Sequence, residues 1–135
     1  MRRQHKGDVY MSTIKITLLV AAILTTSSPA RAADAWSKQD VALLATYATV
    51  HAMDWGQTLY VTRHPDQFKE TNPMFGSGHP SEGRVNTVMA AQLAIIAAAT
   101  HYMPAKHRPW FQCITIGLRS AIVGWNYSIG VKTTF

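Results

Sequence analysis

The chain has 135 residues, one cysteine and a formal net charge of +6 at pH 7. A single cysteine excludes an intrachain disulfide. The basic charge is concentrated in the first 32 residues, and the formal charge of the remainder is only +2. The high pI of the whole chain is therefore no evidence for a nucleic-acid partner, and we expect none.

The first 32 residues resemble an export signal. Residues 1–10 are polar and basic, and Met11 is a candidate start site, in which case residues 1–10 are a mis-called extension. Lys15 then precedes an apolar run over residues 16–24, and Ala30-Arg31-Ala32 forms an A-x-A site. This order is typical of a secretory signal peptide. We expect residues 11–32 to be a signal peptide cleaved near Ala32, with an uncleaved anchor as the alternative, and residues 33–135 to form a single helical domain.

The first predicted helix covers about residues 38–62. Ser37 is a good N-cap, and Asp40 three residues later resembles the partner residue of a capping box. The helix is expected to stop before His64-Pro65, because the residue before a proline disfavours helical backbone angles.

The segment 63–84 is rich in proline and glycine and is therefore predicted to be a linker. Within it, Asn72-Pro73-Met74-Phe75-Gly76 predicts one short helical turn that is capped by Asn72 and closed by Gly76. Glu70, Asn72, Pro73 and Gly76 are therefore expected to fasten this loop. The linker also holds two histidines and two carboxylates: His64, Asp66, Glu70 and His79. These residue types can bind zinc, but they do not stand at a typical metal-binding spacing, so zinc binding is a minority alternative.

Two further helices are predicted over about residues 84–103 and 109–131, joined by a short basic turn. Residues 85–103 contain no Asp, Glu, Lys or Arg, and about 20 such residues span a bilayer as a helix. Residues 41–61 and 110–131 of the other two helices are similar but carry Asp54 and Arg119, respectively. The predicted fold is an all-α three-helix bundle that is embedded in a membrane.

Polar side chains recur on one face of the first and third helices. Tyr47, His51, Asp54 and Thr58 are spaced four, three and four apart, and Gln112, Arg119 and Asn126 are seven apart. If the three helices alternate in direction, the first and third are parallel, and the depths of Asp54 and Arg119 differ by about 6 Å at 1.5 Å per residue. We therefore expect Asp54 and Arg119 to meet, in a network completed by three further side chains: His51, Gln57 and Asn126. A pair that fixes the packing register is one interpretation, and a proton or ion path is the other.

A resemblance to a known group of proteins rests on residues 50–90 and on the closing Asn126-Tyr127-Ser128-Ile129-Gly130-Val131. Asp54-Trp55-Gly56-Gln57-Thr58 and the segment Glu70–Gly76 give the pattern D-x-x-Q-T followed by E-x-N-P-h-h-G. The pattern resembles small uncharacterised helical proteins of proteobacteria and their phages. The resemblance implies a membrane-associated helical protein and implies no activity.

The sequence thus predicts a small integral protein of the bacterial envelope, in the inner membrane, with a structural or interaction role and no catalysis, metal or cofactor. Its expected partners are the lipid bilayer and another membrane protein or a second copy. One alternative is a soluble periplasmic helical protein that binds a hydrophobic ligand. The other is a conducting bundle that uses Asp54 and Arg119.

Overall fold

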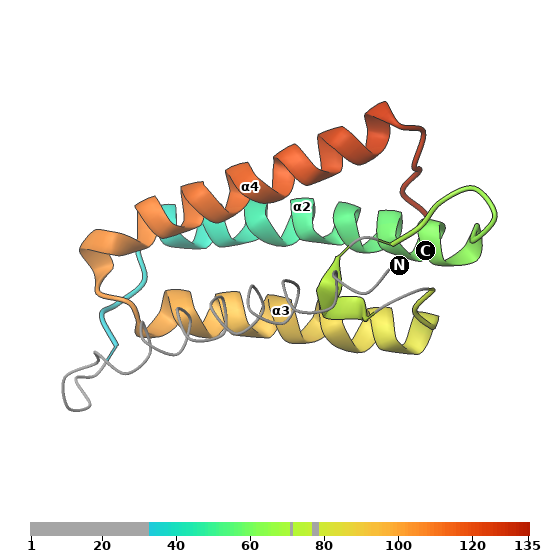
Figure 1. Cartoon of the computed structure of the whole chain (residues 1–135). Coiled ribbons are helices and arrows are strands. Elements are labelled where there is room, and N and C mark those ends of the chain that lie inside the picture. Colours follow the sequence, from blue (N-terminus) through green and yellow to red (C-terminus); the bar gives the residue numbers. More distant parts are fainter. Residues whose placement is uncertain (1–32, 71, 77–78) are drawn as a thin grey trace, which may run out of the picture. The chain divides into compact units, whose positions relative to one another are not determined.

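A computed structural model describes residues 33–70, 72–76 and 79–135, so the predicted signal peptide lies outside the described residues. This part of the chain contains helices and no strands (Figure 1). The prediction of an all-α fold is therefore confirmed. In chain order, its elements are α2 (Lys38–Arg63), the 3-10 turn η1 (Pro73–Phe75), α3 (Glu82–Tyr102), the 3-10 turn η2 (Ala105–His107) and α4 (Arg108–Ser128).

The helix α2 begins as its sequence predicts. The Ser37 hydroxyl accepts from the Asp40 amide at 3.0 Å, and the Asp40 carboxylate accepts from the Ser37 amide at 2.9 Å. This reciprocal pair is a capping box, which satisfies two amide donors that a helix start leaves unpaired.

The other two helices differ from the predicted bounds for local reasons. The helix α3 begins at Glu82 because the Ser81 side chain caps it, accepting from the Arg84 amide at 3.3 Å. The helix α4 ends at Ser128 and not at Val131, because Gly130 adopts a φ of 89°. Glycine populates this left-handed region at little cost, and it commonly ends helices.

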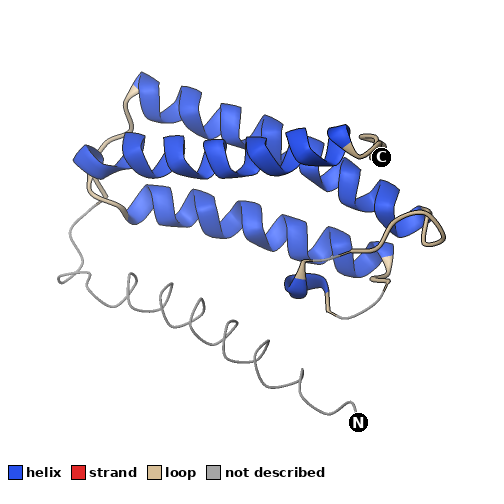
Figure 2. Ribbon diagram, turned by 45° about the horizontal axis from the view of Figure 1, so that its top comes forward, coloured by secondary structure: helices blue, strands red, loops and turns tan. Residues whose placement is uncertain are grey.

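The described helices lie side by side, and α2 packs chiefly against α4 (Figures 1 and 2). Contacts between α2 and α4 advance in the same direction along both helices, from Asp40 with Gln112 to Gln57 with Asn126. Contacts between α2 and α3 advance in opposite directions along the two helices. The helices α2 and α4 are therefore parallel, and α3 is antiparallel to both.

A small apolar core joins α2, η1 and α3. It consists of four buried side chains, with Trp55 and Val88 packed against them: Leu59, Phe75, Val85 and Met89. The short turn η1 thus places Phe75 into the core, which leaves that side chain 3% exposed.

Among the described residues, no helix combines the length and the apolar character that crossing a bilayer requires. The expectation of membrane-spanning helices therefore finds no support in α2, α3 or α4. In α3, which carries no formal charge over residues 85–103, Asn86, Gln92 and His101 lower the mean hydropathy.

Candidate functional site

Polar side chains line the seam between α2 and α4. On α2 they are Asp40, Tyr47 and Asp54, which are seven residues apart, and all three are buried. On α4 the matching positions are Gln112, Arg119 and Asn126. A seven-residue spacing returns to nearly the same face after two helical turns, so the two sets face each other along the parallel helices.

Arg119 is the centre of this seam. Its Nη1 donates to Oδ2 of Asp54, and its Nη2 donates to Oε1 of Gln92 at 2.9 Å and to the Tyr47 hydroxyl at 3.3 Å. The structure therefore brings Asp54 and Arg119 together as the sequence predicts, and it adds Tyr47 and Gln92. Burial disfavours the charged guanidinium, but its interactions with Tyr47 and Asp54 outweigh burial and raise the pKa of Arg119.

His51 lies beside this cluster without a hydrogen bond to it. Its Nε2 is 3.0 Å from the carbonyl oxygen of Met89 on α3, so Nε2 carries the proton and donates. Its ring stacks on Tyr47 with centroids 5.6 Å apart, and Nδ1 is buried without a hydrogen-bond partner. Burial is the main cause that lowers the pKa of His51. A neutral imidazole is therefore the favoured form.

Gln57 and Asn126 form a separate pair toward the C-terminal ends of α2 and α4. Asn126 Nδ2 donates to Gln57 Oε1 at 3.0 Å, and Gln57 Nε2 donates to the carbonyl oxygen of Val123 at 3.2 Å. Four residues of the predicted network thus join α2 to α4 in two separate pairs, Asp54 with Arg119 and Gln57 with Asn126, whereas His51 bonds to α3.

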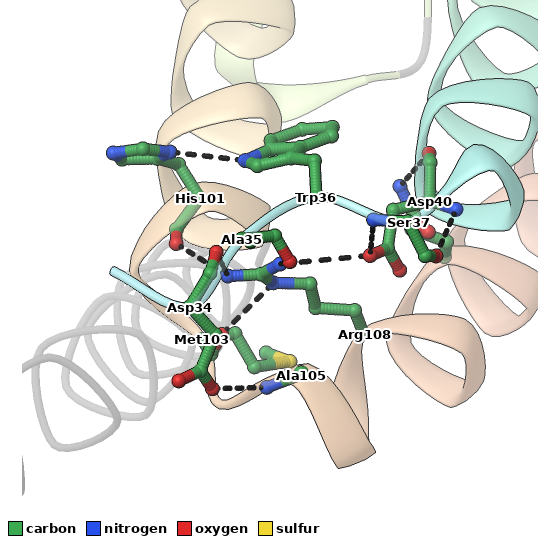
Figure 3. A network of polar contacts seen from close by, with 10 residues as sticks. Asp34, Ala35, Trp36, Ser37, Asp40, His101, Met103, Ala105 and Arg108 are labelled. Carbon is green, nitrogen blue, oxygen red and sulfur yellow. Dashed lines mark hydrogen bonds and ion pairs between the residues drawn. The ribbon is translucent and has the colours of Figure 1, made fainter. Parts of the chain in front are cut away.

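A second buried charge, Arg108, was not singled out from the sequence, in which it falls within the short basic turn between the second and third predicted helices. The Arg108 side chain is fully buried, and Figure 3 shows its guanidinium surrounded by backbone carbonyls. It donates to four carbonyl oxygens at 2.8–3.1 Å, which belong to Asp34, Ala35, His101 and Met103. These contacts fasten the segment before α2 to the end of α3 and the start of α4.

Arg108 also pairs with Asp40, whose Oδ2 lies 3.5 Å from Nη1. The hydrogen bond from the Ser37 amide is the main cause that lowers the pKa of Asp40; burial opposes this, and Arg108 adds to it. A sequence signal did exist: an arginine in the first turn of a helix faces the positive end of the helix dipole and is disfavoured there unless it finds acceptors.

Further contacts around Arg108 hold the same segments together. Its guanidinium carbon lies 5.6 Å from the centre of the Trp36 ring, and Trp36 Nε1 donates to His101 Nδ1 at 3.1 Å. The Ala105 amide donates to Asp34 Oδ2 at 2.8 Å (Figure 3). Residues 34–36 are thereby held against the connection between α3 and α4.

The predicted loop fasteners have local partners. Glu70 Oε1 accepts from the Asn72 amide at 2.7 Å, and Asn72 Oδ1 accepts from the Met74 amide at 3.0 Å, which caps η1 at Pro73. Gly76 has a φ of 88° and lies against the Arg84 guanidinium. The turn predicted over residues 72–76 is present.

The polar groups of the seam are largely paired with one another. Within residues 33–70, 72–76 and 79–135, no three His, Cys, Asp or Glu side chains gather as a metal site would require. His64 of the linker stacks on Tyr60, with its Nδ1 2.8 Å from the Tyr60 carbonyl oxygen. The arrangement is suited to holding helices in register.

Comparison with known proteins returned no match: no protein-family model, no curated protein and no solved structure matches this chain. The resemblance to small proteobacterial and phage proteins therefore stays a prediction.

Proposed function

We propose that this chain is a non-catalytic helical protein that associates with a lipid bilayer through the outer face of α4. The observation that carries the proposal is the inverted polarity of α4. Its inward positions include Arg108, Gln112 and Arg119, whereas its outward positions are occupied by large apolar side chains. An ordinary amphipathic helix in a water-soluble bundle has the reverse distribution.

The outer face of α4 carries a continuous apolar stripe, which we define as Trp110, Ile114, Leu118, Ile122 and Trp125. These residues are spaced four, four, four and three apart and therefore share one face. Their exposed fractions range from 49% to 74%. A contiguous exposed apolar patch is characteristic of a surface that contacts a membrane or another protein.

The ends of the stripe favour lipid as its partner. Trp110 and Trp125 stand at its two ends, and tryptophan is enriched where apolar and aqueous regions of a bilayer meet. Exposed Lys106 precedes the stripe and exposed Lys132 follows it. Lysine ammonium groups beside an apolar helix face are attracted to anionic lipid headgroups.

The buried polar contacts support a structural role for the interior. Asp54 with Arg119 and Asp40 with Arg108 join the same two helices and have hydrogen-bonding neighbours. Such pairs specify packing register in some proteins. We propose that they hold α4 against α2, so that the stripe is presented as one rigid surface. The proposed location is the inner membrane after export, with the periplasm as the alternative.

Flotation of the purified full chain with vesicles tests the proposal. Vesicles of phosphatidylcholine with phosphatidylglycerol are expected to carry the wild-type chain to the top of a density gradient. Leu118→Lys places a charge in the stripe and is expected to reduce the floated fraction several-fold. The matched control, Ser120→Lys, adds the same charge at an exposed position of α4 outside the stripe and is expected to float like wild type. A wild-type chain that stays at the bottom of the gradient contradicts the proposal, as does equal flotation of the two variants.

A further inference from the structure

A cavity of about 890 Å³ opens beside the seam of α2 and α4, on the side of the linker. Its walls come from both helices, from residues 67–70, 72 and 75 of the linker and η1, and from residues 129 and 131 after α4. Its volume falls in the range of about 300–1,000 Å³ that is typical of small-molecule sites. Two residues of the apolar stripe, Ile122 and Trp125, are also part of this lining.

The cavity has an apolar wall and a polar wall. Phe68, Ile122 and Trp125 contribute to the apolar wall. The polar wall includes Asp54 and Arg119 of the seam, so the central ion pair borders the cavity. A ligand that fits both walls carries an apolar body and a polar group.

The charges around the cavity indicate the sign of that polar group. Asp54 is paired with Arg119, and Glu70 accepts from the Asn72 amide. Lys69 is exposed, and in the described part of the chain its ammonium makes no ion pair or hydrogen bond. Glu70 keeps its negative charge in this hydrogen bond, so the charged groups of the lining balance, and Lys69 is the described lining residue whose charged head group is free to pair with an anionic headgroup.

We propose that this cavity binds an anionic amphiphile of the fatty-acid class. Lys69 pairs with the carboxylate, and the alkyl chain lies against Phe68, Ile122 and Trp125. This inference does not rest on bilayer association through α4, because free fatty acid can enter the cavity from water.

Quenching of tryptophan fluorescence tests the site, because Trp125 lines it. The full chain is titrated with 11-bromoundecanoate, whose bromine quenches indole on contact, and with the uncharged 11-bromoundecanol. Saturable quenching by the carboxylate is expected in wild type and is expected to be largely lost in Trp125→Phe. Quenching that rises without saturation, as in simple partition into an apolar surface, overturns the proposal.

Two pairs of variants test whether Lys69 binds the carboxylate and whether the alkyl chain lies in the cavity. Lys69→Gln is expected to weaken binding of the carboxylate by about five- to tenfold, as loss of one charge-assisted contact would, and to leave binding of the alcohol unchanged. Lys106→Gln, the matched control on η2, is expected to bind like wild type. Ala121→Phe fills the cavity and is expected to abolish saturable quenching by both probes, whereas Ala98→Phe on the exposed face of α3 is expected to preserve it. Equal affinities of Lys69→Gln and Lys106→Gln for the carboxylate overturn the proposal even if the cavity-filling variant fails to fold.

Discussion

Arg119 of α4 donates to the carboxylate of Asp54 of α2, a residue 65 positions earlier, and so joins two parallel helices in their central turns. Their side chains are only 16% and 6% exposed. A charge buried to this extent is stable only while its partner remains. The pair therefore ties the packing of α4 to one register on α2.

Removal of one member of this pair is expected to cost more than removal of both. Asp54→Leu leaves the Arg119 charge uncompensated and is expected to lower the free energy of unfolding by about 3 kcal/mol. The double variant Asp54→Leu with Arg119→Met places apolar groups on both sides and is expected to recover most of that loss. Denaturant unfolding of the two single variants and the double variant measures the coupling.

A conducting role for the same pair predicts a different result. Asp54→Asn would then fold with wild-type stability and lose proton or ion flux across vesicle membranes. Strong destabilisation of Asp54→Asn, without measurable flux in wild type, is the outcome that the structural role predicts.

Arg108 is expected to be irreplaceable by lysine. Its planar guanidinium donates to four carbonyl oxygens that lie in different directions, and a lysine ammonium cannot reproduce this fork. Arg108→Lys is therefore expected to lower the free energy of unfolding by about 2–4 kcal/mol, in the range for a broken buried charge contact. Lys106→Ala, two residues away and exposed, is expected to change it by less than about 0.5 kcal/mol. Equal unfolding midpoints for the two variants would exclude the anchoring role of Arg108.

Gly56 and Gly117 are expected to respond oppositely to alanine. A Cβ at Gly56 would lie 2.8 Å from Cγ2 of Thr133 and 3.1 Å from the carbonyl oxygen of Thr134, so the C-terminal segment must shift. Gly56→Ala is therefore expected to destabilise by about 1–3 kcal/mol. A Cβ at Gly117 meets nothing within 4 Å, and Gly117→Ala is expected to stabilise α4 by up to about 1 kcal/mol. Thermal unfolding of the two variants checks the sign of each change.

His51 is expected to make stability dependent on pH. A histidine in an unfolded chain has a pKa of about 6.5, and burial lowers the pKa of His51 in the folded chain, so the unfolded chain binds a proton first as pH falls. The stabilisation that depends on neutral His51 is fully present above about pH 6.5. As pH falls from there toward the pKa of His51 in the folded chain, the free energy of unfolding decreases by at most about 1.4 kcal/mol per pH unit.

His51→Gln isolates this effect, because glutamine can still donate to the Met89 carbonyl oxygen but does not titrate. The difference in unfolding free energy between wild type and His51→Gln is expected to shift against wild type between pH 7.5 and 5.5. A difference that stays constant over that range would exclude His51 as the source.

The positions of the helices and the contact between Asp54 and Arg119 could be predicted from the sequence. Ser37 with Asp40 marks the start of α2, and Asn72 with Gly76 frames η1, because caps and turns depend on local backbone chemistry. The contact of Asp54 with Arg119 could be predicted because parallel helices translate residue spacing into depth.

Other features depend on packing that spacing does not encode. Arg108 lies two residues after Lys106 in the same basic turn, and only the chain path through residues 34–36 buries one and exposes the other. The cavity lined by Lys69 and Trp125 likewise depends on how the linker folds back on the helices. The spacing of Gln112, Arg119 and Asn126 predicted that one face of α4 is polar. That this polar face turns inward became clear only from the packing of α4 against α2.

Cys113 offers the most direct test of the claim that the outer face of α4 contacts lipid. It is the only cysteine of the chain, it is exposed, and it lies on α4 beside Trp110. We predict that a membrane-impermeant maleimide leaves Cys113 unmodified in washed membranes and modifies it fully after solubilisation in detergent. Ser120→Cys in a Cys113→Ser background serves as the exposed control on α4 outside the stripe and should react in both conditions. Rapid modification of Cys113 in intact membranes, or recovery of the chain only in the soluble fraction, would contradict the account.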